Sequence, residues 1–378
     1  MASPRVAMIG QKGWPPIHGG IERHVAELAP RLAARGWAVD IYSRPHYSAH
    51  HGDTGLPGVR VVRRPSLATK HLDAITHALV CTFDALRGDA RIVHYHALGP
   101  GLLAGLPRWL AGKPTVVTVH GLDWQRQKWG RLARWVLRGG EQASFRLPER
   151  TIVVSQALQT WFRQRHGRET IYIPNGVGAP VYRPMRLARE RGVDRPFVLF
   201  AGRLVPEKGC HLLTRAWAAL PAALRESHRL VIAGDAGFTD AYVRALRAEA
   251  PADTLFLGFV HGELLQELYT NAELVVLPST MEGLSIALLE GMSYARCCLA
   301  SDIPPNREAA ADCAPLFPAG DVRALTARLA ELLLDPQVRR CYGEAGQLRV
   351  IEHYSWERAA DLTAAVYAEL AASRGGTA

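Results

Sequence analysis

The sequence predicts an α/β protein with two doubly wound domains, and three observations lead to this prediction. Short β-rich runs alternate with helical stretches from end to end, as expected for βα units around a parallel sheet. The 378 residues are enough for two domains of ordinary size. A proline-broken stretch at 174–195 interrupts the alternation once. We therefore expect a first domain at 1–183, a second domain at 184–354 and a final segment at 355–378.

Seven strands are expected in the first domain and five in the second. In chain order they are "RVAMIG", "WAVDIYS", "VRVVRR", "RIVHYH", "PTVVTVH", "RTIVVS" and "TIYIPN", then "FVLFAG", "RLVIAG", "TLFLGF", "ELVVLPS" and "RCCLAS". Helical patterns such as "GGIERHVAELAPRLAARG" lie between most of them. The stretch "YSWERAADLTAAVYAELAAS", which begins one residue before the final segment, is an amphipathic helix that follows two others and has no strand after it. We expect this C-terminal helix to cross back to the first domain.

The composition is that of a soluble globular protein, with 48% hydrophobic and 21% charged residues. No apolar run approaches the ~18 residues of a membrane span, and the start lacks the apolar core of a signal peptide. The six cysteines form no C-x-x-C pair, so we expect reduced thiols in a cytoplasmic protein. The net charge of +10 either favours an anionic partner or reflects an arginine-rich composition. Without a zinc-finger, RNA-recognition or basic-zipper pattern, we expect no nucleic-acid partner.

The stretch "STMEGLSIALLEGMSYA" at 279–295 places two glutamates, Glu282 and Glu290, eight positions apart. If a helix begins after Gly283, the two lie about 12 Å apart along its axis and about 80° apart around it. Glycosidase carboxyls lie roughly 5 to 9.5 Å apart across one bond, so this pair better suits two ends of one long ligand. A buried helix with two charged ends is the alternative. An anion site at the helix start would use the amides of Leu284, Ser285 and Ile286.

In open parallel sheets, ligands bind beyond the carboxyl ends of the strands, so the strand-end loops are the expected sites. "LFAGRLVPEKGCHLL" places Arg203 and Lys208 around one turn, and a guanidinium with an ammonium suits a diphosphate. A solvated pair with Glu207 between them is the alternative. "IGQKGWPPIHGGIERHV" opens a helix with Gly19 and Gly20, which allow close approach of a phosphate or sugar. It is not the dinucleotide fingerprint, and a flexible loop is the alternative.

Histidines form a further group of candidates. His120 in "VTVHGLDWQ" follows a strand, and although a lone histidine is more often structural, a mid-sheet strand end favours a place in the ligand site. His94 and His96 share one strand face in "VHYHALGPG", and no carboxylate lies nearby in the sequence to complete a set of metal ligands with them. We expect these two to line the site or the core, and we expect no metal site.

Taken together, these segments resemble the family-four retaining glycosyltransferases of the GT-B fold, which include many bacterial cell-surface polysaccharide and lipid-linked sugar transferases. The resemblance covers almost the whole chain and rests on Glu-x7-Glu, "GRLVPEKG", "GGIERHV" and "VHGLDWQ". It implies two Rossmann-like domains facing across a cleft. It also implies transfer of a sugar from a nucleoside-diphosphate sugar to a sugar or lipid-linked acceptor, with retention of anomeric configuration and without metal or cofactor.

The resemblance implies a role for each candidate residue. Glu282 would contact the transferred sugar, and Glu290 would hold the ribose hydroxyls. Arg203 and Lys208 would stabilise the leaving diphosphate, and His120 would lie beside the anomeric carbon. The other donor-binding candidates are Gly19 and Gly20, in a loop that closes on the donor, and Gly283, Leu284 and Ser285, at the start of the glutamate helix.

Two other functions stay open on the sequence: a GT-B-type nucleotide-sugar epimerase and a non-catalytic nucleotide-sugar-binding protein. A nicotinamide-dependent oxidoreductase would need a compact glycine fingerprint after its first strand. A metal-dependent glycosyltransferase of the other major fold would need an Asp-x-Asp, which the chain lacks. The glutamate helix departs from the family pattern at Gly291 and Ala295, which leaves the nucleotide preference open.

A basic stripe in "DWQRQKWGRLARWVLRGG" suggests where the acceptor is met. At about 100° per residue, three arginines share a stripe roughly 60° wide, with Trp135 near its edge and apolar residues on another side. The arginines are Arg131, Arg134 and Arg138, and the apolar residues are Trp129, Leu132 and Val136. Such a stripe attracts an anionic membrane. We therefore expect peripheral contact with the inner face of a membrane, with a solvated helix face as the alternative.

Overall fold

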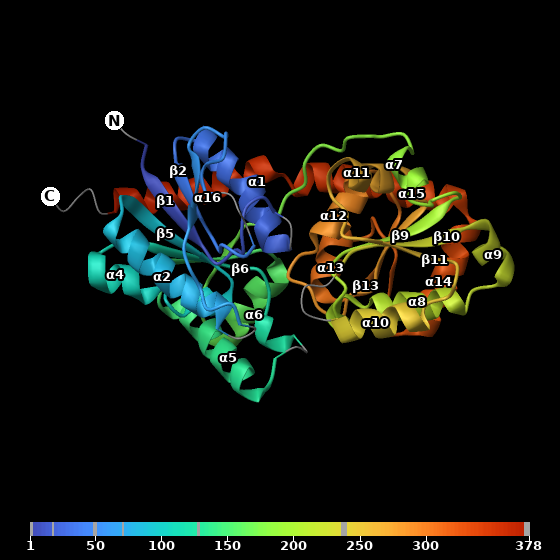
Figure 1. Cartoon of the computed structure of the whole chain (residues 1–378), viewed down its shortest axis with the longest axis horizontal. Coiled ribbons are helices and arrows are strands. Elements are labelled where there is room, and N and C mark those ends of the chain that lie inside the picture. Colours follow the sequence, from blue (N-terminus) through green and yellow to red (C-terminus); the bar gives the residue numbers. More distant parts are fainter. Residues whose placement is uncertain are drawn as a thin grey trace. The chain divides into compact units, whose positions relative to one another are not determined.

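The computed structural model describes residues 3–16, 19–47, 51–69, 72–126, 129–235 and 240–373. The chain divides into two compact units, Met1–Asn175 with Trp356–Ala378 and Gly176–Ser355 (Figure 1). Each unit contains one sheet whose neighbouring strands run parallel, apart from a short antiparallel edge pair in the first unit. The predicted doubly wound α/β class is therefore confirmed.

The first unit holds an eight-stranded sheet in the order β3-β4-β2-β1-β5-β6-β7-β8. Its strands are β1 (Arg5–Ile9), β2 (Ala38–Ser43), β3 (Gly52–Asp53), β4 (Val59–Arg63), β5 (Ala90–His96), β6 (Thr115–Val119), β7 (Arg150–Val153) and β8 (Ile171–Tyr172). Its helices are α1 (Gly20–Ala34), α2 (Asp73–Arg87), α3 (Leu98–Gly101), α4 (Gly105–Ala111), η1 (Asp123–Gln125), α5 (Arg131–Arg146), α6 (Gln156–His166) and α16 (Trp356–Ala372). All seven predicted strands are present, and the edge strand β3 was not predicted.

The second unit holds a six-stranded sheet in the order β11-β10-β9-β12-β13-β14. Its strands are β9 (Phe197–Ala201), β10 (Arg229–Ala233), β11 (Thr254–Gly258), β12 (Leu274–Leu277), β13 (Cys298–Asp302) and β14 (Leu316–Pro318). Its helices are α7 (Leu187–Glu190), η2 (Pro206–Lys208), α8 (Cys210–Ala218), α9 (Ala222–Ser227), α10 (Asp240–Glu249), α11 (Gly262–Asn271), α12 (Ile286–Ser293), α13 (Pro304–Ala310), α14 (Val322–Leu334) and α15 (Pro336–His353). The five predicted strands are present, and β14 is additional.

The boundaries of the units differ from those expected from the sequence. The expected division at 183/184 lies at 175/176 instead, and the second division lies at 355/356 rather than 354/355. Residues before 184 already bond within the second unit: the Val177 amide donates to the Tyr354 carbonyl at 2.9 Å, and the Arg183 amide donates to the Thr270 hydroxyl at 3.1 Å. The proline-rich composition marks the connection between the domains, but it does not show to which of the two units these residues bond. The last residues of the expected segment, 374–378, lie outside the described residues.

Helix α16 packs in the first unit, as the sequence predicts for the C-terminal helix. It lies beside α1 in Figure 1, where Arg35 pairs with Asp361 at 2.7 Å and with Glu357 at 3.0 Å. The Tyr367 hydroxyl, which is fully buried, hydrogen-bonds His94 Nδ1 on β5 at 2.5 Å. Because the surface ion pairs are worth little individually, the burial of Tyr367 and its neighbours Val366 and Leu370 contributes more to this packing than they do.

Each sheet has one switch point, where the strand order turns from one side of the first strand to the other. In the first unit it lies between β1 and β5, and in the second between β9 and β12. A glycine with positive φ stands at each: Gly10 (φ 128°) and Gly209 (φ 69°). A Cβ on Gly10 would lie 2.2 Å from the His96 carbonyl oxygen, and one on Gly209 would lie 2.0 Å from the Pro278 carbonyl oxygen. Only glycine therefore allows the strand-end loops to approach this closely.

We predict that Gly209→Ala lowers the free energy of unfolding by at least about 2 kcal/mol, because the methyl group adds a backbone clash to an unfavourable φ. Gly202→Ala in the same loop is the matched control, since its Cβ would meet only the Phe200 ring at an ordinary 3.7 Å. Denaturant titration of both variants measures the difference. Equal, small effects of the two substitutions would contradict the close approach.

Candidate active site

The switch point of the second unit brings Lys208 and Glu282 together. Lys208 ends η2 in the loop after β9, and Glu282 lies in the loop after β12. The Lys208 Nζ lies 2.6 Å from Glu282 Oε1, with side-chain exposures of 20% and 8%. The Thr280 amide donates to the Glu207 carbonyl at 2.9 Å, so the backbones of the two loops are also joined. The sequence analysis placed these two residues in one site but did not predict that they form an ion pair.

This pair leaves the lysine with further binding capacity. An ammonium group carries three N–H donors, of which Glu282 takes one. The pair is only partly exposed, so its charges are poorly screened by water. An anionic ligand that reaches the loop would therefore meet a cation already held in place. Arg203 follows β9 in the same loop and is half-buried, and its carbonyl accepts the Val205 amide at 3.0 Å.

The two glutamates do not share one helix, because the helix that the sequence analysis considered directly after Gly283 begins further along the chain. Helix α12 begins at Ile286, and Ser285 is its N-cap: the Ser285 hydroxyl accepts the Leu288 amide at 3.4 Å. A serine hydroxyl is a favoured cap because it satisfies a free first-turn amide. Glu282 lies in the preceding loop, with buried residues Gly283 and Leu284 between it and the cap. The first turn of the helix, which begins at Ile286 rather than at Leu284, thus lies two residues further along than expected.

Glu290 lies on α12, half-buried, beside a tyrosine that the sequence analysis missed. Tyr269 on α11 is buried, and its hydroxyl hydrogen-bonds the Glu290 carboxylate. Burial, together with the nearby Glu290 charge and this hydrogen bond, raises the pKa of Tyr269 well above its ordinary value. Tyr269 also stacks on Tyr294, with ring centroids 5.5 Å apart. The Glu290 side chain is therefore oriented by a neutral phenol from a different helix.

In the first unit, Gly19 and Gly20 lie at the start of α1, as predicted, with Gly19 as the N-cap. Glu22 in the first turn of α1 accepts the Lys12 amide at 2.9 Å and so ties the loop after β1 to the helix. A Cβ on Gly19 would lie 2.8 Å from Glu22 Oε2, which shows how closely this carboxylate lies against the glycine. Ile17 and His18, in the same predicted loop, lie outside the described residues. Glu22 was not predicted as a site residue.

His120 follows β6, as predicted, and lies in a group of histidines. Its Nε2 is 3.2 Å from His96 Nδ1, and its ring centroid is 4.7 Å from that of His24 on α1. His94 and His96 are fully buried in the core of the first unit. His94 has a structural role, because its nitrogens bond the Tyr367 and Thr118 hydroxyls at 2.5 and 2.7 Å. Sequence reasoning missed His24.

Burial keeps these histidines neutral at pH 7. It lowers the pKa of His24 to about 4 and that of His94 to about 3. Burial is also the first cause, and the neighbouring histidines a further cause, of the lowered pKa values of His96 and His120. The histidine group therefore offers neutral donors and acceptors, which suit hydroxyl groups better than phosphates.

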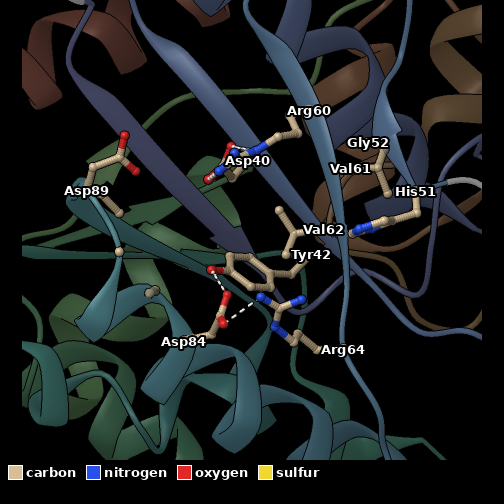
Figure 2. Close-up of a pocket in the computed structure, with 13 residues that line it drawn as sticks. Asp40, Tyr42, His51, Gly52, Arg60, Val61, Val62, Arg64, Asp84 and Asp89 are labelled. Atoms are coloured by element: carbon tan, nitrogen blue, oxygen red, sulfur yellow. Dashed lines mark hydrogen bonds and ion pairs between the residues drawn. The ribbon is translucent and has the colours of Figure 1, made fainter.

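A cavity of about 240 Å³ in the first unit is a separate feature (Figure 2). Its three acidic residues are already paired: Asp40 with Arg60 at 2.7 Å, Asp89 with Arg5 at 2.9 Å, and Asp84 with Arg64 at 2.6 Å and with the Tyr42 hydroxyl at 2.8 Å. None of the predicted site residues lies among the described residues that line it. Its charges compensate each other, and we assign it no ligand.

The fold is that of the GT-B glycosyltransferases, with two Rossmann-like units that each carry candidate residues at strand ends. Sucrose-phosphate synthase from Thermosynechococcus elongatus matches 98% of this chain and 100% of its own, with a TM-score of 0.82 at 21% identity. Anabaena HepE, solved in complex with UDP-glucose, matches 97% of this chain and 99% of its own, with a TM-score of 0.77 at 20% identity.

Sequence comparison defines the family more narrowly. Residues 18–179 match "Glycosyltransferase Family 4", and residues 186–349 match "Glycosyl transferases group 1". The alpha-maltose-1-phosphate synthase of Mycobacterium tuberculosis (strain ATCC 25618 / H37Rv) is 30% identical over 413 residues, which cover 97% of this chain and all of the relative. The chain therefore belongs to the family-four glycosyltransferases, and the recognised resemblance is confirmed at that level.

We predict that the protein, measured in the presence of EDTA, loses stability as the pH falls from 6.5 towards 4. In that window the unfolded chain binds a proton at His24 that the folded chain does not, so unfolding becomes easier by about 1.4 kcal/mol per pH unit for this one group. His24→Asn should therefore flatten the dependence. Urea titrations between pH 4.5 and 6.5 measure both slopes. Identical slopes for the two proteins would show that His24 does not contribute.

Proposed function

We propose that the protein transfers a sugar from a nucleoside-diphosphate sugar to an acceptor with retention of anomeric configuration and without a metal cofactor. The observation that carries the proposal is the Lys208–Glu282 pair at the switch point of the second sheet, beside the start of α12. Ligands of open parallel sheets bind at such switch points. The complex of HepE with UDP-glucose supports a nucleotide-sugar donor, because the two proteins share this fold.

The residues of the second unit suit successive parts of such a donor. Lys208 and Arg203 would hold the diphosphate, and the first-turn amides of α12 would add hydrogen bonds to it. Glu290, oriented by Tyr269, would accept the ribose hydroxyls. Glu282 would contact the transferred sugar at the other end.

In the reaction, the bond between the anomeric carbon and the diphosphate oxygen breaks, and the acceptor oxygen bonds to the same face. The acceptor proton passes to the leaving phosphate oxygen. Negative charge therefore develops next to Lys208, and a preorganised cation there would lower the barrier by about 3 to 4 kcal/mol. In the first unit, His120 would contact the sugar as a neutral group, and Gly19 and Gly20 would allow close approach of the donor.

We also propose that the acceptor is sugar-like or lipid-linked, in surface polysaccharide or glycolipid assembly, and is met at the inner face of a membrane. The start of α5 supports this proposal: Leu132 and Trp135 are 75% and 73% exposed, next to the exposed Arg131 and Arg134. Exposed apolar and basic residues on one helix are typical of interfacial helices. The expected position of Trp129 on this helix is wrong, because α5 begins at Arg131. Among the described residues, no helix has the length and apolar character to cross a bilayer.

Incubation of nucleoside-diphosphate sugars with and without acceptor, in the presence of EDTA, tests the proposal. Nuclear magnetic resonance should show a glycoside with the donor's anomeric configuration, formed only when acceptor is present. Glu282→Ala should lower turnover more than diphosphate affinity, whereas Glu290→Ala should weaken nucleotide binding. Glu263→Ala, a surface substitution on α11, is the matched control.

Each other outcome has a defined meaning. An isomerised donor without acceptor would identify an epimerase, and binding without any reaction would identify a binding protein. Activity that is lost in EDTA and restored by magnesium would contradict metal independence. Equal losses of diphosphate affinity in the two glutamate variants would contradict their separate roles.

We predict that the protein sediments with anionic vesicles at low salt and that replacing Arg131, Arg134 and Arg138 with glutamine weakens this binding. Each basic residue near the surface contributes about 1 kcal/mol before salt screening, hence ~3 kcal/mol in total. The control variant replaces three exposed arginines of the second unit, Arg323, Arg328 and Arg340, with glutamine. Its net charge is therefore the same as that of the α5 variant. Equal binding of the two triple variants would contradict a specific role for α5.

A further inference from the structure

We propose that His24, His96 and His120 form a binding site for a transition-metal ion of the zinc class. One ring nitrogen from each histidine can be chosen so that all three lie within 4.8 Å of one another. The three residues come from α1, from the end of β5 and from the residue after β6. Three rigid segments of the first unit thus place three imidazoles around one point.

The environment of His24 fixes which of its nitrogens would bind the ion. Its Nδ1 lies 2.9 Å from the Asn175 Oδ1, and because a carbonyl oxygen only accepts, Nδ1 carries the proton. Nε2 therefore holds a lone pair. His24 is 3% exposed, and its Nε2 has no hydrogen-bond partner among the described residues. A buried acceptor without a partner is costly, and a metal ion would satisfy it.

The spacing of the other two histidines also fits. His96 Nδ1 and His120 Nε2 are 3.2 Å apart. Two ligands of a tetrahedral zinc ion, each about 2.0 to 2.1 Å from the metal, lie about 3.3 Å apart. Without metal, one of these rings donates a proton to the other. With metal, both nitrogens would offer lone pairs after a change of tautomer, and the distance between them would hardly change.

The type of ligand indicates the type of ion. Imidazole nitrogens suit zinc, copper, iron or nickel, whereas magnesium and calcium prefer oxygen ligands. His94 is not a ligand, because both its nitrogens bond hydroxyl groups. His120 is half-buried, so solvent reaches this ligand, and a water molecule would take the fourth position of a three-histidine site. The sequence analysis expected no metal site because it looked for a carboxylate, whereas the third ligand is a histidine from another segment.

Metal binding would lower the rate of the proposed sugar transfer. The ion would take the lone pair of His120, which we propose contacts the sugar, so zinc would inhibit transfer and a chelator would restore it. This consequence rests on the proposed function, whereas the metal site itself does not.

Cobalt(II) is the probe that tests the site without any sugar substrate. The full chain, free of any affinity tag and stripped with EDTA, is titrated with cobalt chloride and followed by the visible absorption of tetrahedral cobalt. We expect one ion per chain, displaced by one equivalent of zinc. His24→Asn keeps a donor for Asn175 but lacks Nε2, and should weaken cobalt binding by about 100-fold or more. His353→Asn, at an exposed histidine on α15, should bind cobalt like the unchanged protein.

A second variant, Asn175→Ala, tests the site even if His24→Asn does not fold. Asn175→Ala leaves all three imidazoles but removes the group that orients His24, and should weaken cobalt binding by about 10- to 100-fold. Circular dichroism of the metal-free variants establishes that they are folded. Absence of a tetrahedral cobalt spectrum in the unchanged protein, or full binding in folded His24→Asn or Asn175→Ala, would overturn the proposal. Loss of sugar transfer alone would leave it standing.

Discussion

The close approach of the loops after β9 and β12 is the constraint on which the candidate site of the second unit depends. Gly209 makes it possible, because a side chain there would meet the Pro278 carbonyl oxygen at 2.0 Å. The approach joins the loops through the Thr280–Glu207 hydrogen bond and places Lys208 against Glu282 at 2.6 Å. The chemistry of the site is thus a consequence of backbone packing at the switch point.

The first unit uses the same device for different chemistry. Gly10 brings the end of β1 against the His96 carbonyl, and α1, which follows, carries His24 to the rings of His96 and His120. Here burial leaves neutral imidazoles rather than an ion pair. Charged groups in the second unit suit phosphates, and neutral imidazoles in the first suit hydroxyls or a transition-metal ion of the zinc class. This division of chemistry agrees with a transferase that binds an anionic donor.

The sequence predicted the strands well because strands buried on both faces are continuous apolar runs. It also proposed Lys208 and Glu282 as site residues, since strand-end loops of such sheets are the expected sites, and the structure brings these two side chains together. It failed where contacts join distant segments. His24 hydrogen-bonds Asn175, and Tyr269 hydrogen-bonds Glu290. Both contacts are formed by the tertiary fold, and the hydrophobic periodicity of a sequence does not predict them. The start of α12 was misplaced because Gly283 was taken as the helix boundary, although Ser285 is the better cap.

The central claim is that the diphosphate of a nucleotide lies at the β9–β12 switch point. Calorimetry measures the affinities for UDP and for uridine, and their ratio gives the contribution of the diphosphate directly. The measurement is repeated with ADP and adenosine and with GDP and guanosine. The account predicts that Lys208→Met lowers the ratio of the two affinities by about 10- to 100-fold, since a hydrogen bond to a charged group contributes about 1.5 to 3 kcal/mol. Glu290→Ala should lower both affinities and leave the ratio unchanged. A ratio that Lys208→Met does not alter would contradict the account.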